Sequence, residues 1–231
     1  MRLNNHVLPV VFALLSASSL VLPVQAQTAG TPTTTTDSRN QGVYDFFAAQ
    51  AVKSSFRDQG IVKASVLDTD ETNRLCSAAD VAGKPLDKKT AKRIEQANLK
   101  TIQWPANGKF LGDWREGEKI AQSGRGLTYT DAANTVNGGN CYNCHQIDKK
   151  EISFGTIGPS LVNYGKLRGV VDPSSAAAKP VVEYTWGKIW NSKAYNACSN
   201  MPRAGHNGIL TAAQIADVMA LLLDPKSPVN Q

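Results

Sequence analysis

The chain has 231 residues, of which 42% are hydrophobic and 19% are charged, as in a soluble globular protein of one or two domains. This composition argues against a disordered or fibrous chain. The formal net charge of +6 is mild and scattered along the sequence, which argues against nucleic-acid binding. It favours plain solvation, with encounter of an acidic protein or an anion as the alternative.

The N-terminal segment has the pattern of an export signal. Arg2 gives a positive start, residues 7–24 form an apolar run broken by prolines and serines, and small residues surround Ala26. This pattern predicts a secretory signal peptide over residues 1–26, cleaved after Ala26, and therefore a periplasmic protein. An uncleaved anchor is less favoured because the run is short and interrupted by proline. No later segment is apolar enough to predict a membrane span in the mature protein.

The region after the cleavage site is predicted to begin with a flexible stretch. Residues 27–42 are rich in threonine, with Gly30 and Pro32, and read as a leader with nothing to pack. Residues 43–57 carry apolar side chains near helical spacing and predict a helix that Gly60 ends. Residues 61–67 predict a short strand or extended segment.

A second helix is expected over residues 87–102, with Asp87 as its N-cap. One face of this helix carries lysine and arginine, which is more typical of a solvated surface than of a docking site. Residues 43–107 are therefore interpreted as an accessory, mostly helical extension, and residues 108–231 as the main domain. The segment from Trp104 to Gly112 marks the boundary between them.

The main domain opens with an Asp-x-x-Glu pattern. Asp113 and Glu116 have the spacing of a capping box and predict a helix that runs to about Ser123. A loop rich in glycine, asparagine and threonine follows and leads to the most informative stretch of the sequence.

That stretch is Cys141-Tyr142-Asn143-Cys144-His145, two cysteines two residues apart with a histidine directly after the second. This is the pattern of a c-type haem attachment site. On one helical turn the thiols of Cys141 and Cys144 reach the two vinyl groups of one haem, and His145 supplies the proximal iron ligand. A redox dithiol would require a βαβ pattern around the motif. A zinc site would require a second ligand pair at metal spacing. Neither is present, so the motif predicts one covalent haem c.

A loop after the motif offers a partner for the histidine. A proximal histidine usually gives its second ring N–H to a carbonyl or carboxylate, which fixes the ring and raises its basicity. The turn that ends at Pro159 is able to place its carbonyl oxygen there, since proline has no amide hydrogen to draw the segment into a helix. A plain turn before the next helix remains an equal alternative.

Two further helices are expected in the C-terminal half. Residues 181–192 place Val182, Trp186, Ile189 and Trp190 on one face, as core or as the wall of a haem pocket. Thr211 and Gln214 form a second capping box. The helix that they open has an apolar stripe, ends at Asp224-Pro225, and is expected to pack across the helix at 113–123.

Few residues of the mature chain are candidates for the second iron ligand. Outside the signal segment the histidines are His145 and His206, and the methionines are Met201 and Met219. Met219 lies in the apolar stripe of the last helix, where methionine usually fills core space. Met201 lies in a loop stiffened by Pro202, so its thioether is the favoured ligand opposite His145. His206, a Cys198 thiolate and an open site remain alternatives. A Met/His pair raises the reduction potential and leaves no vacancy for a substrate, which predicts electron transfer.

Two cysteines are not needed for haem attachment. In an oxidising compartment Cys76 and Cys198 are expected to form a disulfide that ties the extension to the Met201 loop. Two separate thiols, one of them reactive, are the alternative.

Together these motifs resemble a known family. Cys-x-x-Cys-His, Gly158-Pro159-Ser160-Leu161, Asn200-Met201-Pro202-Arg203 and the C-terminal Leu-Thr-x-x-Gln-Ile helix are similar to class I cytochromes c. The sequences around Cys141 and around Met201 resemble those of SoxX, the monohaem subunit of the SoxAX cytochromes of thiosulfate oxidation. The resemblance covers residues from about 108 to the C-terminus and implies a mainly α fold, a class I cytochrome c-like haem domain behind a helical extension.

The resemblance also implies partners and a reaction. SoxAX acts as an L-cysteine S-thiosulfotransferase, which joins thiosulfate to a cysteine of a SoxYZ-like carrier protein and releases two electrons. The catalytic haem of that family lies on the SoxA-like subunit. This chain would accept electrons and pass them to a soluble acceptor. The alternatives are a free-standing periplasmic electron-transfer cytochrome c and the haem subunit of another sulfur oxidoreductase. A thiol–disulfide exchanger or metal-binding module is a third class, and it predicts a colourless protein.

Overall fold

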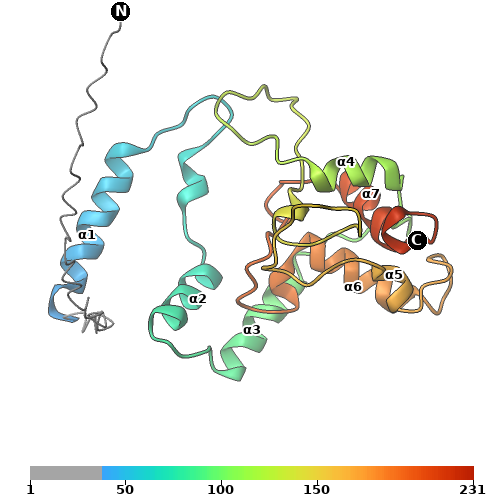
Figure 1. The fold of residues 1–231 in the computed structure, drawn as a ribbon. Helices are drawn as coiled ribbons and strands as arrows, with labels where there is room; N and C mark the ends of the chain where they lie inside the picture. The colour runs from blue at the N-terminus through green and yellow to red at the C-terminus, as the bar shows by residue number, and fades with distance from the viewer. Residues whose placement is uncertain (1–37) are drawn as a thin grey trace, which may run out of the picture. The chain divides into compact units, whose positions relative to one another are not determined.

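The computed structural model describes residues 38–231 and, for side chains, residues 42–231. The predicted signal peptide at 1–26 and most of the leader at 27–42 lie outside the described residues. The chain divides into two units, residues 1–50 and residues 51–231. Figure 1 shows a helical molecule, and within the described residues the only β pairing is an isolated bridge between Gln59 and Val62. The α-helices are α1 (Ser38–Ser55), α2 (Glu71–Val81), α3 (Lys88–Leu99), α4 (Trp114–Gln122), α5 (Tyr164–Leu167), α6 (Lys179–Trp190) and α7 (Ala212–Leu223).

Four short 3-10 segments complete the described elements: η1 (Ala64–Leu67), η2 (Cys141–Asn143), η3 (Ser192–Ala194) and η4 (Pro228–Asn230). Among residues 38–231, no helix combines the length and the apolar character that crossing a bilayer requires. Helix α1 begins at Ser38, inside the segment predicted as leader, and ends at Ser55, close to the predicted end at 57. Its aromatic residues Phe46 and Phe47 are exposed.

The sequence predicted a short strand or an extended segment at 61–67, and no strand forms there, because residues 64–67 form η1. The Asp58 carboxylate accepts the Ala64 backbone N–H at 2.9 Å and pairs with Lys63 Nζ at 2.9 Å. These contacts close a turn that passes through Gly60, whose φ is +56°, and η1 follows. A strand needs a neighbouring strand for its hydrogen bonds, and the described chain supplies only the isolated bridge.

Helix α2 was not predicted, whereas α3 was. Asp70 caps α2 by accepting the Asn73 N–H at 2.7 Å, and Asp87 caps α3 by accepting the Thr90 N–H at 3.0 Å, as the sequence predicted. Both caps satisfy backbone donors that a helix leaves unpaired at its start. Arg93 of α3 makes a bidentate pair with Glu71 of α2. The two helices are thereby joined on their exposed side.

The core of residues 51–231 lies between α4, α6 and α7 (Figure 1). Trp186 is 1% exposed, and its ring stacks on Trp190 at a centroid distance of 6.0 Å. Both capping-box bonds predicted between Thr211 and Gln214 are present at the start of α7. Asp224 ends α7 as predicted, and its buried side includes Ile215, Val218, Met219 and Leu222.

The capping box predicted for α4 forms only in part. Asp113 is the N-cap, but its carboxylate accepts the N–H of Arg115, and Glu116 pairs with Lys119 at 2.7 Å. The Asp113 backbone N–H is instead bound by the Asp217 carboxylate of α7 at 2.8 Å. A contact between distant helices has replaced the local one, because α4 and α7 cross at this point.

The crossing of α4 and α7 depends on a glycine. A Cβ atom at Gly117 would overlap backbone atoms of Asp217 and Val218. Gly117→Ala should therefore push the helices apart and lower the free energy of unfolding by about 1–3 kcal/mol, the usual cost of overpacking. Chemical denaturation measures this loss. Lys119→Ala, an exposed change on the same helix, is the control and should cost about 0.5 kcal/mol or less. Equal stabilities of the two variants would contradict the proposed close approach.

Candidate haem-attachment site

The two motif cysteines and the histidine lie on one short helical turn. Asn140 enters the turn in the left-handed conformation with φ of 51°, and η2 follows. The N–H groups of Cys144 and His145 both donate to the carbonyl oxygen of Cys141, at 3.1 and 3.0 Å. The Gly139 N–H binds the Ile120 carbonyl at 2.8 Å, which fixes the turn to the end of α4. Both thiols are unpaired, and burial raises the pKa of Cys141 to about 11.

His145 is oriented by the loop that the sequence indicated. Its Nδ1 lies 2.7 Å from the Pro159 carbonyl oxygen, so Nδ1–H donates and Nε2 keeps its lone pair. The loop itself is held to the motif because the Gly158 N–H donates to the Cys144 carbonyl at 2.8 Å. This hydrogen bond settles the earlier alternative of a plain turn: the Pro159 carbonyl does meet the histidine.

The sequence analysis named Gly158 only as part of the Gly158-Pro159-Ser160-Leu161 motif and assigned it no role, although it touches the histidine ring. A Cβ atom at this position would overlap the imidazole carbon Cε1 and both ring nitrogens. Only a residue without a side chain leaves room for the ring here, so Gly158 sets the plane of His145.

Gly158→Ala should displace the ring and break the bond to Pro159. Imidazole basicity then falls, and we expect the reduction potential to rise by on the order of 20–60 mV, the equivalent of a hydrogen bond of about 1 kcal/mol. Redox titration followed by haem absorbance measures the shift. Ser160→Ala, one residue beyond Pro159 and exposed, should leave the potential unchanged. A potential unaffected by Gly158→Ala would show that the loop does not tune the histidine.

Met201 lies in a loop fixed to the end of α6. Its carbonyl oxygen accepts the Ser192 hydroxyl at 2.5 Å, and its N–H donates to Ser199 Oγ at 3.2 Å. Its side chain is partly buried and packs against the same core cluster as Cys141. The structure thus brings the Met201 loop and the attachment turn onto one core.

The rival ligands have other surroundings. Met219 is 0% exposed within α7, as expected of a core residue. The pKa of His206 is lowered, first by burial and then by the nearby charge of Arg203. Cys198 is engaged in a disulfide and has no free thiolate.

The described residues fit a haem group. The indole Nε1 of Trp190 is buried without a hydrogen-bond partner, which is rare in folded proteins and leaves a donor for a carboxylate of a bound group. Two free thiols on one turn, an imidazole with a fixed tautomer and a loop thioether complete the set of donors. Cys141, Cys144, His145 and Met201 would hold the group, with Pro159 orienting His145.

A comparison with protein families gives the same result. The model of the family described as Cytochrome c matches residues 121–225. Residues 121–225 form a cytochrome c domain. Such a domain implies covalent haem c. The predicted fold class, mainly α with a cytochrome c domain behind a helical N-terminal region, is confirmed.

One curated relative is described as an "Uncharacterized lipoprotein" of Aquifex aeolicus (strain VF5). It is 40% identical over 134 residues, which cover 57% of this chain and 59% of the relative. The chain therefore matches less than two thirds of the relative's length.

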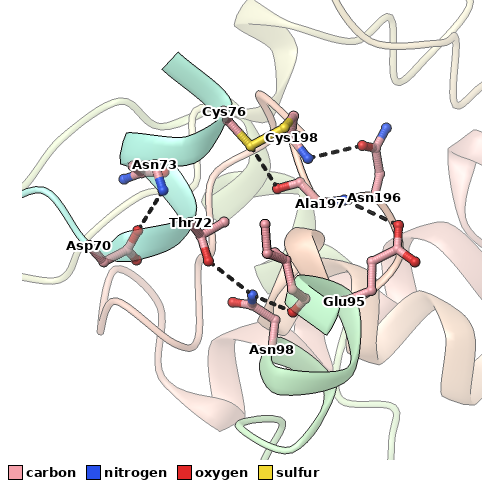
Figure 2. Close-up of a disulfide and its surroundings, with 10 residues drawn as sticks. Asp70, Thr72, Asn73, Cys76, Glu95, Asn98, Asn196, Ala197 and Cys198 are labelled. Atoms are coloured by element: carbon pink, nitrogen blue, oxygen red, sulfur yellow. Dashed lines mark hydrogen bonds between the residues drawn. A yellow bond between two sulfur atoms is a disulfide. The ribbon is translucent and has the colours of Figure 1, made fainter. Parts of the chain in front are cut away.

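The region before the cytochrome c domain is covalently bound to the Met201 loop. Figure 2 shows the disulfide between Cys76 of α2 and Cys198, which spans 122 residues of sequence and is the pairing that the sequence predicted. Cys76 Sγ also lies 3.4 Å from the Ala197 carbonyl oxygen, a contact without a hydrogen because both sulfurs are bonded. The Ala197 N–H donates to the Glu95 carboxylate of α3 at 3.3 Å.

Further polar contacts extend this connection to the end of α6. The buried side-chain amide of Asn191 donates to Asn98 Oδ1 at 3.0 Å and to Thr101 Oγ1 at 2.9 Å. Asn98, on the buried side of α3, in turn donates to the Ile94 carbonyl at 2.8 Å. Because buried polar groups are costly unless paired, this network fixes α3 against the segment that leads to Met201.

An ion pair joins the other side of the loop to α2. Arg203, two residues after Met201, has a side chain only 9% exposed, and its Nη1 lies 2.6 Å from Asp70 Oδ2. Asp70 Oδ1 caps α2, so each carboxylate oxygen has its own partner. Burial alone would raise the pKa of Asp70, but the Asn73 N–H and the Arg203 guanidinium hold it below its ordinary value of 3.8. This pair was not predicted, since its two members are far apart along the chain.

Asp70→Asn should remove the negative charge and keep the cap of α2, since asparagine caps helices as well as aspartate does. It leaves Arg203 nearly buried and unpaired, and we expect a loss of about 1–3 kcal/mol at neutral pH, reduced from the fully buried case because Asp70 is 41% exposed. A carboxyl with a lowered folded pKa stabilises the protein above its unfolded pKa and loses that contribution as the pH falls through the folded value. The difference between the two proteins should therefore shrink below about pH 4. Denaturant titrations of both proteins, at neutral pH and below about pH 4, measure the difference in the free energy of unfolding. A difference that does not depend on pH would exclude the ion pair as its cause.

Proposed function

We propose that this chain is a periplasmic monohaem c-type cytochrome that accepts electrons within a SoxAX-like heterodimer. The observation that carries the electron-transfer part is the hydrogen bond between His145 Nδ1 and the Pro159 carbonyl at 2.7 Å, beside two free thiols on one turn. It leaves the Nε2 lone pair of His145 free to hold iron, and Cys141 and Cys144 would anchor the same group covalently.

The residues of this chain favour electron transfer over substrate chemistry. His145 and Met201 would occupy both axial positions of the iron, so no position is left for a substrate. When bound, the haem supplies a one-electron ferric–ferrous couple. The protein holds the ring of His145, restrains the Met201 loop from both sides and buries the stacked rings of Trp186 and Trp190 in its core. Rigidly held ligands keep the reorganisation energy of electron transfer small.

The SoxAX assignment rests on the resemblance of the segments around Cys141 and Met201 to SoxX. In such a complex the SoxA-like partner would join thiosulfate to a cysteine of the SoxYZ-like carrier and release two electrons. This chain would take those electrons one at a time and pass each to a soluble acceptor. The chain itself then forms no bond to sulfur substrate, and the transferase activity belongs to the complex.

Export is supported by three features. The N-terminal pattern predicts a signal peptide cleaved after Ala26, and the relative from Aquifex aeolicus is described as a lipoprotein, a class of exported protein. The disulfide between Cys76 and Cys198 also fits an oxidising compartment such as the periplasm.

Two measurements test the proposal in sequence. Protein produced with the haem-attachment machinery should show sharp reduced-state haem bands that survive acid–acetone extraction, and a colourless product would instead support the thiol or metal-binding class. Purification from the native host should then yield an equimolar SoxA-like cytochrome partner. A lone coloured monomer would exclude the SoxAX assignment and favour the free-standing electron carrier.

A further inference from the structure

We propose that the disulfide between Cys76 and Cys198 is a thiol-exchange site for a protein dithiol, and that its reduction weakens the grip of Met201 on the iron. The second half of this inference rests on the proposed function, because it requires Met201 as the axial ligand. The first half rests on the disulfide alone.

The disulfide is open to attack. Cys198 is exposed, whereas Cys76 is partly buried in α2. A cavity of about 550 Å³ opens beside both residues, with α2, α3 and the loop at 196–198 among its walls. Its lining includes apolar side chains, among them Pro85 and Leu86, together with Lys84 and Glu95. Exposed disulfides are the labile ones in exchange, since an incoming thiolate must reach one sulfur along the S–S bond.

The position of the disulfide makes its loss consequential. Cys198 lies three residues before Met201 on a segment without regular helix. The bond to Cys76 is the covalent tie between that segment and α2. After its loss, the Ala197 bond to Glu95 and the ion pair of Arg203 with Asp70 would still connect the loop to α3 and α2, and the Ser192 hydroxyl would still connect it to the end of α6. The Glu95 acceptor is only partly buried, so the first bond contributes little against water, and the ion pair would be the stronger of the two remaining ties.

The exchange balances with a dithiol as the two-electron reductant. One thiolate of the dithiol attacks Sγ of Cys198, the bond to Cys76 breaks, and Cys76 leaves as a thiolate that takes a proton from water. The second thiol of the dithiol gives its proton to water and attacks the mixed disulfide, which releases Cys198 as a thiolate that takes up a proton in turn. The reductant ends as a disulfide, and this chain holds two thiols.

The test uses the holoprotein with its disulfide intact. The protein is treated with reduced thioredoxin, with dithiothreitol or with glutathione, then blocked with N-ethylmaleimide, desalted and reoxidised at the haem with ferricyanide. Mass spectrometry should find maleimide on both Cys76 and Cys198 without any denaturant, most rapidly with the dithiols. The rate at which imidazole displaces the ligand from ferric haem should rise by about tenfold or more, because local opening near Met201 becomes easier.

The matched control is Cys76→Ser/Cys198→Ser, which removes the bond without maleimide bulk. It should show the fast imidazole rate from the start and no response to reductant. If labels appear only in denaturant, the exchange site is wrong. If labels appear but the imidazole rate is unchanged, the coupling to Met201 is wrong. If untreated ferric protein lacks the methionine-to-iron charge-transfer band, the proposed axial ligand fails and the coupling fails with it, while the labels still decide the exchange site.

Discussion

Replacing Met201 with leucine should abolish the methionine-to-iron charge-transfer band of the ferric protein. It should also lower the reduction potential by on the order of 100 mV or more, since the choice of axial ligand sets haem potentials over a range of about 0.8 V. The physical reason is that the soft, neutral thioether favours ferrous iron, and leucine offers no donor. Ferric absorption spectra and redox titration measure the two effects. Leucine matches methionine in volume, so the loop should keep its packing against the core.

Met219→Leu is the matched control in the same chain. Met219 is 0% exposed in α7, so this swap changes core packing and should cost less than about 1.5 kcal/mol. Its charge-transfer band and potential should equal those of the wild type. If both methionine variants keep the band, Met201 is not the ligand.

If Met201 is not the ligand, His206 is the alternative iron ligand. It lies five residues beyond Met201, and its backbone N–H donates to the Trp190 carbonyl at 3.0 Å. Were His206 the ligand, Met201→Leu would leave a low-spin ferric spectrum unchanged, and His206→Gln would abolish it. With Met201 as the ligand, His206→Gln should leave the band in place.

The features that were predicted correctly have local signals. The Thr211–Gln214 box and the Asp87 cap require bonds within three residues, and both are present. The haem-attachment motif and the apolar stripe of α6 are likewise defined by residues a few positions apart in the sequence. The long-range disulfide between Cys76 and Cys198 was predicted from the oxidising compartment and from the cysteine count, because only these two cysteines were left once the haem motif was assigned.

The features that were missed depend on contacts between distant segments. Glu116 had the right spacing for a capping box, but Asp217 of α7 binds the Asp113 N–H instead. Helix α2 has a weak apolar pattern and forms where the disulfide and Arg203 hold it. Gly158 stands in a short motif of the sequence, but its role appears only once the ring of His145 lies against it. Tertiary packing decided each of these cases.

Removing the disulfide should destabilise the whole unit from 51 to 231. For a closed loop of 122 residues the chain-entropy model gives about 5 kcal/mol as an upper figure, and we expect about 2–4 kcal/mol for Cys76→Ser/Cys198→Ser. Denaturant unfolding of both proteins, followed by haem absorbance and by far-ultraviolet circular dichroism, measures the loss. Cys76→Ser alone should show the same loss together with a weakened haem spectrum.

The shape of the transition tests the polar contacts as well. The Asn191 amide, bound to Asn98 and Thr101, and the Arg203 pair with Asp70 still join the extension to the cytochrome c domain when the disulfide is absent. If these contacts suffice, the haem and helix signals of the double variant will unfold together at lower denaturant. If they do not, the helix signal will fall first, because α2 and α3 melt before the haem site. Full retention of the wild-type midpoint and haem spectrum would exclude a stabilising link between Cys76 and the Met201 loop.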